Sequence, residues 1–592
     1  MDASRKISVS LMLLLLILAS PILNPLLELL CPEELGASRS VNNGEGRNPN
    51  PNLNGERAGE RVPGAGEPGA DGTLRWRGEG GAGERCVTLE TEVLGLEAEG
   101  RTITVKAFGA AEAKVVSCCG GGGSGGVGRA RRDYVLEMPS DESAARWSAR
   151  LSDRINLLDR PKRLFIIVNP FGGKRCGRKI FQTEVMPLLE AAGILFTMQE
   201  TKYQLHAQEI AHSLDLMKYD GIVCVSGDGV LVEVVNGLLQ REDWDTAIKV
   251  PLGIIPAGTG NGMAKSLLHS VGDLYSVPNA VFAIIQGHKR SLDVASVVQG
   301  GTKFFSILML TWGLIADIDI ESEKYRWMGS ARLDFYSLLR IMNLRKYSGL
   351  VQFVPAPGYE GYGEPIKQID YHKDETTCSQ EGQESNVEAQ TQGYPGPQID
   401  FQTTEWRALD GPFISVWINN VPWASENVMP APDAKFSDGY LDAVIIRDCP
   451  KSALLDLMLK ISDGSYVKSP YVTYLKVKAF RLEPGRRVGN PDKGGIVDSD
   501  GEVIARGDRF HDRSQHENLM AYGPPIQMTV DRVWPPYSLL LDESSFPLTL
   551  YLSFSVLVAS SGTLMVMYSC MYITNGDQDA RVFKLAQKYL LR

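Results

Sequence analysis

Three glycine-rich turns, each directly after a short apolar run, are the part of this sequence best suited to chemistry. They are Asn169-Pro-Phe-Gly-Gly-Lys174, Ser226-Gly-Asp-Gly229 and Pro256-Ala-Gly-Thr-Gly-Asn261. A turn that opens into a helix presents free backbone N–H groups and the positive end of the helix, so it can hold a phosphate without any side chain. Glycine lets the ligand approach the backbone. One such turn usually reflects only turn geometry, but three together favour a phosphate-binding site.

Asp228 is the side chain best placed for catalysis. It lies between two glycines directly after an apolar run, so it has little steric cover. An aspartate with an ordinary pKa of about 4 is ionised at neutral pH and can accept a proton from a hydroxyl group close to a reacting phosphorus atom. The alternative is a helix N-cap, which is a common role of aspartate. The flanking glycines favour catalysis.

Other features of the sequence exclude several classes of site. The first turn lacks the P-loop pattern, and none of the three turns has the G-x-G-x-x-G spacing of a dinucleotide site, which disfavours a nicotinamide-dependent oxidoreductase. The basic cluster Lys174, Arg175, Arg178 and Lys179 could screen phosphates, although such a cluster is more often a solvated helix face. The nine cysteines show no spacing typical of a metal site or a disulfide framework, so we predict no metal-binding residues and a reducing compartment.

The composition is that of a globular protein with linkers. The 592 residues leave room for several domains of about 150 residues each. The chain has 61 basic and 71 acidic residues and a net charge of -10. This balance argues against a nucleic-acid partner bound by diffuse phosphate attraction.

The glycine turns require a framework of alternating strands and helices, which we expect over residues 158–290. Apolar strands over 164–168, 221–225 and 250–255 each run into one turn. Continuous apolar strands that alternate with helices predict a parallel sheet covered on both faces. Such sheets bind ligands at the carboxyl ends of their strands, where all three turns lie. The sequence therefore predicts an α/β nucleotide-binding domain.

A mainly antiparallel β-sandwich domain is expected over residues 291–530. Helical patterns become rare there, and strands are expected over 304–310, 349–354, 413–418, 440–446 and 474–482. Between about 359 and 404 the composition changes to Gln, Glu, Gly and Pro, which predicts a disordered insertion.

A small β-rich module is expected over residues 72–157. Short stretches of strand-like alternation precede a helical pattern over 141–157, for which Ser140 is a suitable N-cap. Several strands closed by one amphipathic helix are similar to a pleckstrin-homology-type domain. Residues 31–71 are rich in Gly, Pro, Asn, Glu and Arg, and we predict a disordered linker.

Both ends of the chain carry an uncharged hydrophobic segment. Residues 1–30 resemble a signal peptide or a signal anchor, because Arg5 and Lys6 precede a leucine-rich run. In the tail over 531–592, the stretch 548–573 is long enough to cross a bilayer. A membrane anchor, a cleaved leader and a buried core helix all remain open for these segments.

Taken together, the motifs resemble those of sphingosine kinases of the plant type, which have a diacylglycerol-kinase-like catalytic domain. The resemblance covers about residues 163–530 without the insertion, and extends weakly back to Gly72. Besides the three turns, the matching segments are Glu233-Val-Val-Asn-Gly237, Asp243-Trp-Asp-Thr-Ala-Ile248, Thr311-Trp-Gly-Leu-Ile-Ala-Asp-Ile-Asp319, Glu321-Ser-Glu-Lys-Tyr-Arg326 with Arg332, and Asp500-Gly-Glu502.

The resemblance implies a role for each matching residue. Asp228 would be the general base, and Asp319 would bind the sphingoid head group. The remaining substrate contacts would be Ser226, Gly227 and Gly229. The ATP contacts would be Asn169, Pro170, Phe171, Thr201, Lys202, Tyr203, Gln204, Leu205, Glu233, Gly258, Thr259, Gly260, Arg326, Arg332, Asp500, Gly501 and Glu502, the last three also near Mg²⁺. Because Arg326 and Arg332 are six residues apart, a shared role requires a break in the helix between them.

The function implied is transfer of the γ-phosphoryl group of ATP to the primary hydroxyl of a sphingoid base, with ATP and Mg²⁺ as cofactors. Asp319 favours a sphingoid base over diacylglycerol, which has no ammonium group to pair with a carboxylate. A diacylglycerol or ceramide kinase and a non-catalytic membrane adaptor remain the alternatives. We expect the catalytic domains to lie in the cytoplasm or on the cytoplasmic face of an intracellular membrane. The expected partner is a membrane surface. No nucleic acid is expected, and the sequence does not identify protein partners.

Overall fold

The computed structural model of the chain describes most of the residues between 56 and 530. The described ranges are 56–63, 72–77, 84–110, 129–173, 175–329, 331–366, 393–397, 405–507 and 519–530, followed by three strands after residue 550. Two compact units are present, Met1–Leu541 and Asp542–Arg592. The predicted leader lies outside the described residues, as does most of the predicted linker.

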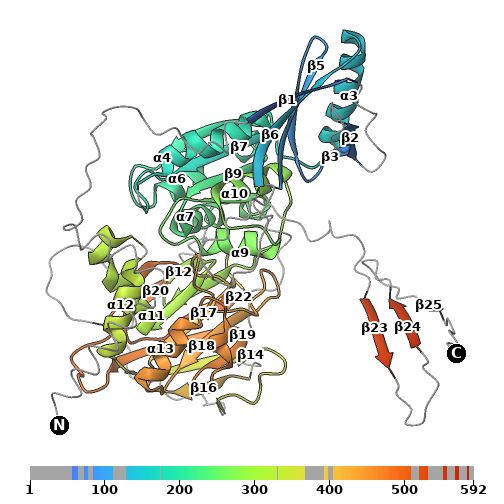
Figure 1. Cartoon of the computed structure of the whole chain (residues 1–592). Coiled ribbons are helices and arrows are strands. Elements are labelled where there is room, and N and C mark those ends of the chain that lie inside the picture. The colour runs from blue at the N-terminus through green and yellow to red at the C-terminus, as the bar shows by residue number, and fades with distance from the viewer. Residues whose placement is uncertain are drawn as a thin grey trace, which may run out of the picture. The chain divides into compact units, whose positions relative to one another are not determined.

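A β-rich module with one long helix begins the described part of the chain (Figure 1). Its sheet has the strand order β1-β6-β5-β4, and β2 and β3 form a separate antiparallel pair. Helix α3 (Asp141–Leu157) begins at Ser140, whose hydroxyl accepts a hydrogen bond from the Ser143 amide, as predicted. The strands are β1 (Glu56–Pro63), β2 (Thr73–Arg77), β3 (Glu84–Thr88), β4 (Val93–Glu99), β5 (Thr102–Ala110) and β6 (Arg129–Glu137).

Strand β1 corrects the prediction that residues 31–71 form a linker throughout. It pairs in parallel with β6, from Glu56 opposite Arg132 to Pro63 opposite Glu137. β1 is an edge strand of its sheet, and an edge strand forms backbone hydrogen bonds with a neighbouring strand on one side only. The polar composition that suggested a linker is therefore compatible with a strand.

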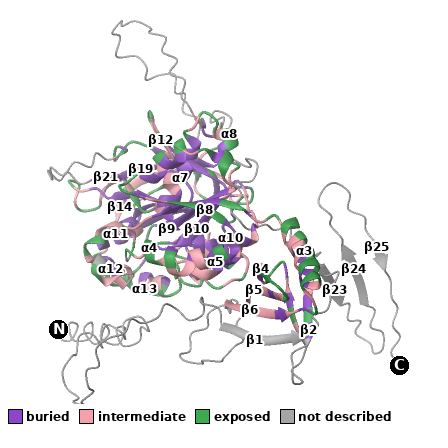
Figure 2. Cartoon of the chain, turned by 90° about the horizontal axis from the view of Figure 1, so that it is seen from above, coloured by how far each residue is buried: buried purple, intermediate pink, exposed green. Residues whose placement is uncertain are grey.

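The strands predicted before the glycine turns form a parallel sheet, as expected. The order is β10-β9-β7-β8, and all neighbours are parallel. Every residue of β9 and β10 is buried (Figure 2), because helices cover both faces. The strands are β7 (Arg163–Val168), β8 (Leu195–Glu200), β9 (Gly221–Ser226) and β10 (Leu252–Pro256).

Each face of this sheet has its own helical layer. Helices α6, α7 and α9 share a core with Phe165, Ile222 and Ile254 on one face. Helices η2, α5 and α10 pack on Leu164 and Ile166 on the other face. The helices of this region are α4 (Gly177–Ile180), η2 (Phe181–Val185), α5 (Met186–Ala191), α6 (His206–Ser213), η3 (Leu216–Lys218), α7 (Asp228–Leu239), α8 (Trp244–Ala247), α9 (Gly262–Ser270) and α10 (Val277–Gln286).

The second half of the chain forms one large antiparallel sheet of twelve strands. Its main path is β12-β11-β22-β19-β18-β17-β13-β20-β21, and β14 joins the long strand β19. The strands are β11 (Ala295–Gln299), β12 (Thr302–Ser306), β13 (Met309–Gly313), β14 (Tyr347–Pro355), β15 (Glu364–Pro365), β16 (Arg407–Asp410), β17 (Ser415–Asn419), β18 (Leu441–Ile446), β19 (Thr473–Arg487), β20 (Ile496–Ser499), β21 (Glu502–Arg506) and β22 (Ile526–Val530).

One face of this sheet curls around a common core. Val297 of β11 and Ile504 of β21 come from opposite ends of the strand order, yet both belong to the cluster around Trp312. The predicted strand over 304–310 is two strands, β12 and β13. Helices that the sequence interpretation missed belong to the other face, namely α11 (Leu314–Glu321), η4 (Ser322–Met328), α12 (Ala331–Met342), α13 (Lys451–Leu459) and η5 (Ser465–Lys468). Residues of α11, α12, α13 and η5 share a separate cluster there with Trp417 and Val444.

Part of the predicted insertion over 359–404 is ordered. Residues 359–366 and 393–397 are described. Tyr394 is buried and its ring stacks on Phe305. The prediction of disorder is therefore wrong for these two stretches, because an aromatic anchor holds the second one. Residues 367–392 and 398–404 lie outside the described residues.

The second unit contains a three-stranded antiparallel sheet formed by β23 (Tyr551–Val556), β24 (Met567–Tyr572) and β25 (Phe583–Leu585). Two of these strands lie within the hydrophobic stretch 548–573. Among the described residues, no helix has the length and apolar character required to cross a bilayer.

Candidate active site at the meeting of three glycine turns

The three glycine turns contact one another at the carboxyl edge of the parallel sheet. A Cβ atom added to Gly258 would lie 2.4 Å from the Cα atom of Gly227, and one added to Gly173 would lie 2.9 Å from the carbonyl carbon of Gly258. Side chains at these positions would therefore clash with backbone. The close approach brings the phosphate-binding candidates of three separate strands into one site.

The first and the third turn each contain an asparagine whose side chain forms hydrogen bonds with the backbone of that turn. The Asn169 Oδ1 atom accepts hydrogen bonds from the amides of Phe171 and Gly172, at 2.9 and 3.2 Å. Asn261 accepts from the Gly258 amide at 3.2 Å and donates to the Gly258 carbonyl at 3.1 Å. Asn261 was not among the predicted site residues, although it stands at the end of the quoted motif.

Asp228 is buried between the starts of two helices. It is the first residue of α7, whose N-cap is Gly227. Its carboxylate accepts hydrogen bonds from the amides of Gly262 at 2.6 Å and Met263 at 3.2 Å, at the start of α9. The capping alternative is thus partly correct, because Asp228 caps a neighbouring helix and not its own.

The surroundings of Asp228 shift its acidity toward neutral pH. Burial disfavours the charged form and raises its pKa to about 7, although the amides of Gly262 and Met263 act in the opposite direction. The nearby charge of Asp500 raises the pKa further. A carboxyl group with this pKa is suited to proton transfer near pH 7.

The segment Thr201 to Leu205 follows β8 and lies beside the same edge. The Thr201 amide donates to the Val168 carbonyl at 2.9 Å, and Leu205 has a left-handed backbone with φ of 66°. The Gln204 side chain reaches Glu502 at 3.5 Å. This contact links two predicted nucleotide segments that are almost 300 residues apart in the chain.

The other predicted residues of that edge have defined contacts. Glu233 accepts a hydrogen bond from the Ala207 amide at 3.1 Å. It therefore holds the start of α6 in place. The Tyr203 hydroxyl donates to Glu209 at 2.6 Å, and the Lys202 amide donates to the His206 ring at 3.1 Å.

Asp500 and Gly501 form the two-residue turn between β20 and β21. Their φ angles are 52° and 89°, as hairpin turns of the Asp-Gly type require. One carboxylate oxygen of Asp500 accepts from the amides of Leu308 and Met309 at 2.8 and 2.9 Å, and from the Ser306 hydroxyl at 3.1 Å. The other oxygen is buried and has no hydrogen-bond partner in the described part of the chain.

Asp319 and Arg332 lie on neighbouring helices, α11 and α12. Burial raises the pKa of Asp319 to about 6, whereas the positive charge of Arg332 lowers it. Between α11 and α12, η4 is kinked at Tyr325 and Gly329 has a positive φ of 62°. The helix break expected between Arg326 and Arg332 is therefore present. The Arg326 side chain lies outside what the structure describes.

A network around Asp317 fixes these helices to the sheet. One Asp317 oxygen accepts hydrogen bonds from the Tyr347 hydroxyl at 2.7 Å and from Arg340 and Arg345 at 3.2 Å each. Arg345 also contacts Glu321 at 2.7 Å. The network positions α11, and with it Asp319. It escaped sequence interpretation because the partners are 23 to 30 residues from Asp317.

Asp498 is a further buried carboxylate that sequence interpretation missed. It lies on β20 opposite Thr311 of β13 and is 0% exposed. Burial raises its pKa well above the usual value, and the negative charges of Asp319 and Asp500 act in the same direction. The available signal was its position two residues before Asp500, in the same Asp498-Ser-Asp-Gly-Glu502 segment.

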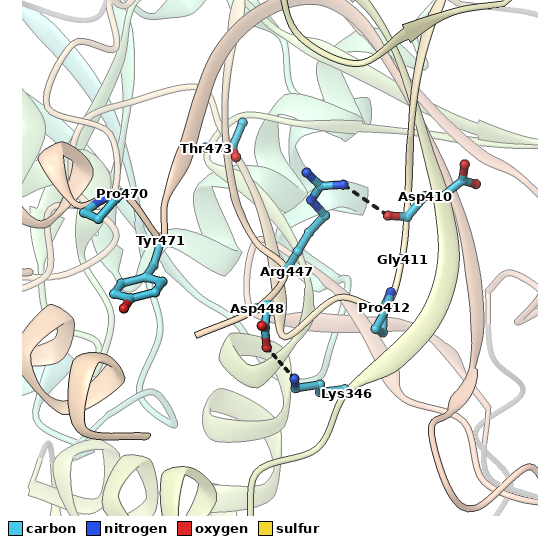
Figure 3. Close-up of a pocket in the computed structure, with 9 residues that line it drawn as sticks. All are labelled: Lys346, Asp410, Gly411, Pro412, Arg447, Asp448, Pro470, Tyr471 and Thr473. Atoms are coloured by element: carbon cyan, nitrogen blue, oxygen red, sulfur yellow. Dashed lines mark hydrogen bonds and ion pairs between the residues drawn. The ribbon is translucent and has the colours of Figure 1, made fainter. Parts of the chain in front are cut away.

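A separate hollow of about 560 Å³ lies in the antiparallel domain. Its lining includes Lys346, Arg447 and Tyr471, and Lys346 contacts Asp448 at 2.6 Å (Figure 3). None of the residues predicted from the motifs lines it. The candidate active site is therefore the sheet edge and not this hollow.

Comparison with known proteins places the chain among lipid kinases. Residues 163–297 match the diacylglycerol kinase catalytic domain, and residues 396–510 match the YegS C-terminal NAD kinase beta sandwich-like domain. A diacylglycerol kinase structure from Bacillus anthracis has 17% sequence identity and a TM-score of 0.40, covering 65% of this chain and 99% of its own.

Several curated relatives are similar over most of their length. Sphingosine kinase 2 of Arabidopsis thaliana is 54% identical over 78% of this chain and 92% of the relative. Human sphingosine kinase 1 is 33% identical over 59% of this chain and 88% of the relative. Human ceramide kinase is 30% identical over 60% of this chain and 69% of the relative. With its glycine turns and buried Asp228 in one site, the chain belongs to the sphingosine kinase family.

Proposed function

We propose that this chain transfers the γ-phosphoryl group of ATP to the primary hydroxyl of a sphingoid base and releases the base 1-phosphate. One observation carries the proposal: Asp228, a buried carboxyl group with a pKa of about 7, lies where three glycine turns meet. The turns offer backbone donors for phosphates. Asp228 offers an acceptor for the proton that the attacking hydroxyl must lose.

In this proposal the protein supplies positioning and charge. The amides of Gly262 and Met263 hold the Asp228 carboxylate in one orientation, so it is pre-organised to accept the proton as the oxygen attacks phosphorus. The amides of the turns and the starts of α7 and α9 favour the phosphates. Arg332, which is 6% exposed, stabilises the negative charge that develops on the transferred group.

Asp319 is proposed to select the head group. A sphingoid base carries an ammonium group, and a carboxylate binds it through charge-assisted hydrogen bonds. In diacylglycerol and ceramide no cationic amine is present, so the half-buried Asp319 would gain no charged ligand there. A diacylglycerol or ceramide kinase remains the alternative that a substrate panel must exclude.

The residues present also fit a magnesium ion bound together with ATP. The second Asp500 oxygen is buried without a partner, and Asp500 would hold the ion with phosphate oxygens as the other ligands. Among the described residues, no group of three or more His, Cys, Asp or Glu side chains forms a metal site. This matches Mg²⁺, which often takes one or two carboxylates plus substrate phosphates. When bound, the ion neutralises phosphate charge.

The decisive experiment uses the purified full chain with γ-labelled ATP and a panel of sphingosine, ceramide and diacylglycerol. We expect label transfer to sphingosine, and transfer slowed by roughly 10²–10⁴-fold with Asp228→Asn. Preferential labelling of diacylglycerol or ceramide would instead support the related kinase, and ATP binding without any transfer would support a non-catalytic adaptor.

We further propose that residues 72–157 form a pleckstrin-homology-like module, that 158–290 bind ATP and that 291–530 bind the lipid. The catalytic body would face the cytosol, where ATP is available, and would visit a membrane surface to meet its substrate. Vesicle sedimentation of the full chain and of a chain lacking residues 1–157 tests this arrangement. If the full chain and the shortened chain sediment equally with vesicles, the module over residues 72–157 does not contribute to membrane binding.

A further inference from the structure

Asn236 lies in the helix that begins with Asp228, and the proposed mechanism gives it no role. It is 5% exposed, and the helix around it, α7, is mostly apolar. Asparagine is a poor helix former, and a buried amide group requires hydrogen-bond partners. An asparagine at this position is therefore explained only by a partner outside the helix.

The partner of Asn236 is the backbone of Phe305 on β12. The Asn236 Oδ1 atom accepts a hydrogen bond from the Phe305 amide at 2.9 Å, and the Nδ2 atom donates to the Phe305 carbonyl at 2.8 Å. β12 is an edge strand of the antiparallel sheet, so one side of it presents backbone groups that need partners. The side-chain amide offers both a donor and an acceptor. Asn236 therefore takes the place of a neighbouring strand at this point.

Tyr394 forms a second link between the same two elements. Its amide donates to the carbonyl of Leu239, the last residue of α7, at 2.8 Å. Its carbonyl accepts from the Lys303 ammonium group of β12 at 2.9 Å. The Tyr394 ring is buried and stacks on the Phe305 ring, with centroids 5.5 Å apart. Phe305 is thus held by its backbone through Asn236 and by its ring through Tyr394.

We propose that Asn236 and Tyr394 are positioning residues for phosphoryl transfer. This inference rests on the proposed function. α7 carries Asp228 about 12 Å along its axis from Asn236, in the domain proposed to bind ATP, and β12 belongs to the domain proposed to bind the lipid. Because a helix is a rigid element, fixing its end to β12 also fixes Asp228 relative to the bound base. A misplacement of about 1 Å can cost about 10²-fold in rate.

The test compares transfer to the base with hydrolysis of ATP by water. Both rates are measured with γ-labelled ATP on the full chain, on Asn236→Ala and on Tyr394→Ala, and dissociation constants for ATP and sphingosine are measured by calorimetry. We expect kcat for sphingosine phosphorylation to fall about ten- to hundred-fold. The number of ATP molecules consumed per base phosphorylated should rise, because attack by water needs no alignment of the lipid domain. Both dissociation constants should stay at the parental values.

The ratio of ATP consumed to base phosphorylated separates positioning from folding. A variant that only folds less well loses both reactions in proportion, so its ratio stays parental. Tyr394→Ala keeps the test open if Asn236→Ala does not fold, because Tyr394 lies outside the helices and strands. Tyr394→Phe keeps the ring and should retain the parental ratio. Tyr471→Ala, which changes an exposed tyrosine of the same domain, is the matched control and should keep the parental kcat and ratio.

The outcomes decide each residue and also distinguish the two proposals. A parental ratio in either alanine variant would overturn the role of that residue. A loss of transfer that is explained by weaker binding of sphingosine or ATP would overturn positioning altogether. A parent chain that phosphorylates no sphingoid base refutes the proposed function. A parent that phosphorylates sphingosine, together with alanine variants that match its kcat and its ratio, refutes this inference alone.

Discussion

Two aspartates of the antiparallel sheet are equally buried and yet have opposite surroundings. Asp442 on β18 and Asp498 on β20 are 1% and 0% exposed. Asp442 contacts the Lys476 ammonium at 2.9 Å and accepts a hydrogen bond from the Tyr474 hydroxyl. Asp498 has one bond from Thr311 and three negative neighbours. The first carboxylate has the partners that folding requires, and the second lacks them.

The difference suggests how to tell structural from functional carboxylates in this fold. Burial raises the pKa of both, but Lys476 offsets the effect at Asp442, whose pKa is about 6. Asp228 at the sheet edge resembles Asp498 in this respect, because the charge of Asp500, which is also negative, adds to the effect of burial on its pKa. We therefore expect buried carboxylates without a cationic partner to be the functional ones.

The largest effect should come from Asp228→Asn. The substitution keeps the shape but removes the proton acceptor, and a general base contributes roughly 10²–10⁴-fold to turnover. We expect kcat to fall by that factor while ATP affinity remains normal, measured by label transfer and calorimetry. Asp215→Asn, at an exposed aspartate, is the matched control. Near-normal turnover in Asp228→Asn would show that another residue is the general base.

Lys476→Met removes the cationic partner of Asp442. Asp442 then becomes a buried carboxylate without a cation, as Asp498 is. Removing one partner of a buried ion pair typically costs about 3–5 kcal/mol. We expect the free energy of unfolding in urea to fall by about this amount. Turnover per folded molecule should be unchanged, because Asp442 lies outside the site. A variant with parental stability and weak sphingosine binding would show that Asp442 is functional after all.

Alanine at Gly258 and at Gly260 should have different effects. A Cβ atom at Gly258 would clash with Gly227, whereas nothing lies within 4 Å of one at Gly260. Overpacking costs typically about 1–3 kcal/mol, so Gly258→Ala should lower both Tm and activity. Gly260→Ala should keep the parental Tm and weaken ATP binding only. Equal Tm values for the two variants would argue against contact between the turns.

The smallest effect concerns pH. If Asp228 must be ionised to act, kcat/KM for the free enzyme rises about tenfold from pH 6 to pH 8, around the pKa of about 7. The free energy of unfolding should change with pH in the opposite direction to kcat/KM. The folded form holds the proton up to a higher pH than the unfolded chain does, so the free energy of unfolding falls as pH rises from about 4 to 7. Asp228→Asn should remove this slope, which denaturant titrations at several pH values can measure.

The sequence predicts the parallel sheet well because its strands are continuous apolar runs that end in glycine turns. It predicts α11 and α12 poorly. Gly313 ends β13 and leads straight into α11, so no polar loop marks the change from strand to helix. Motif spacing reveals Asp228 and Asp500. It cannot reveal Asp498 or Asp317, whose importance depends on partners that only the folded chain brings near.

Because the glycine turns contact one another, the presence of these glycines in a related protein does not by itself indicate that the protein is active. Gly173, Gly227 and Gly258 leave no space for side chains at one another's backbone. A descendant that had lost catalysis would still need these glycines in order to fold. Retained glycines therefore diagnose an intact scaffold, and the unbalanced carboxylates diagnose a working enzyme. Genome surveys for active members of this fold should weigh the aspartates above the glycines.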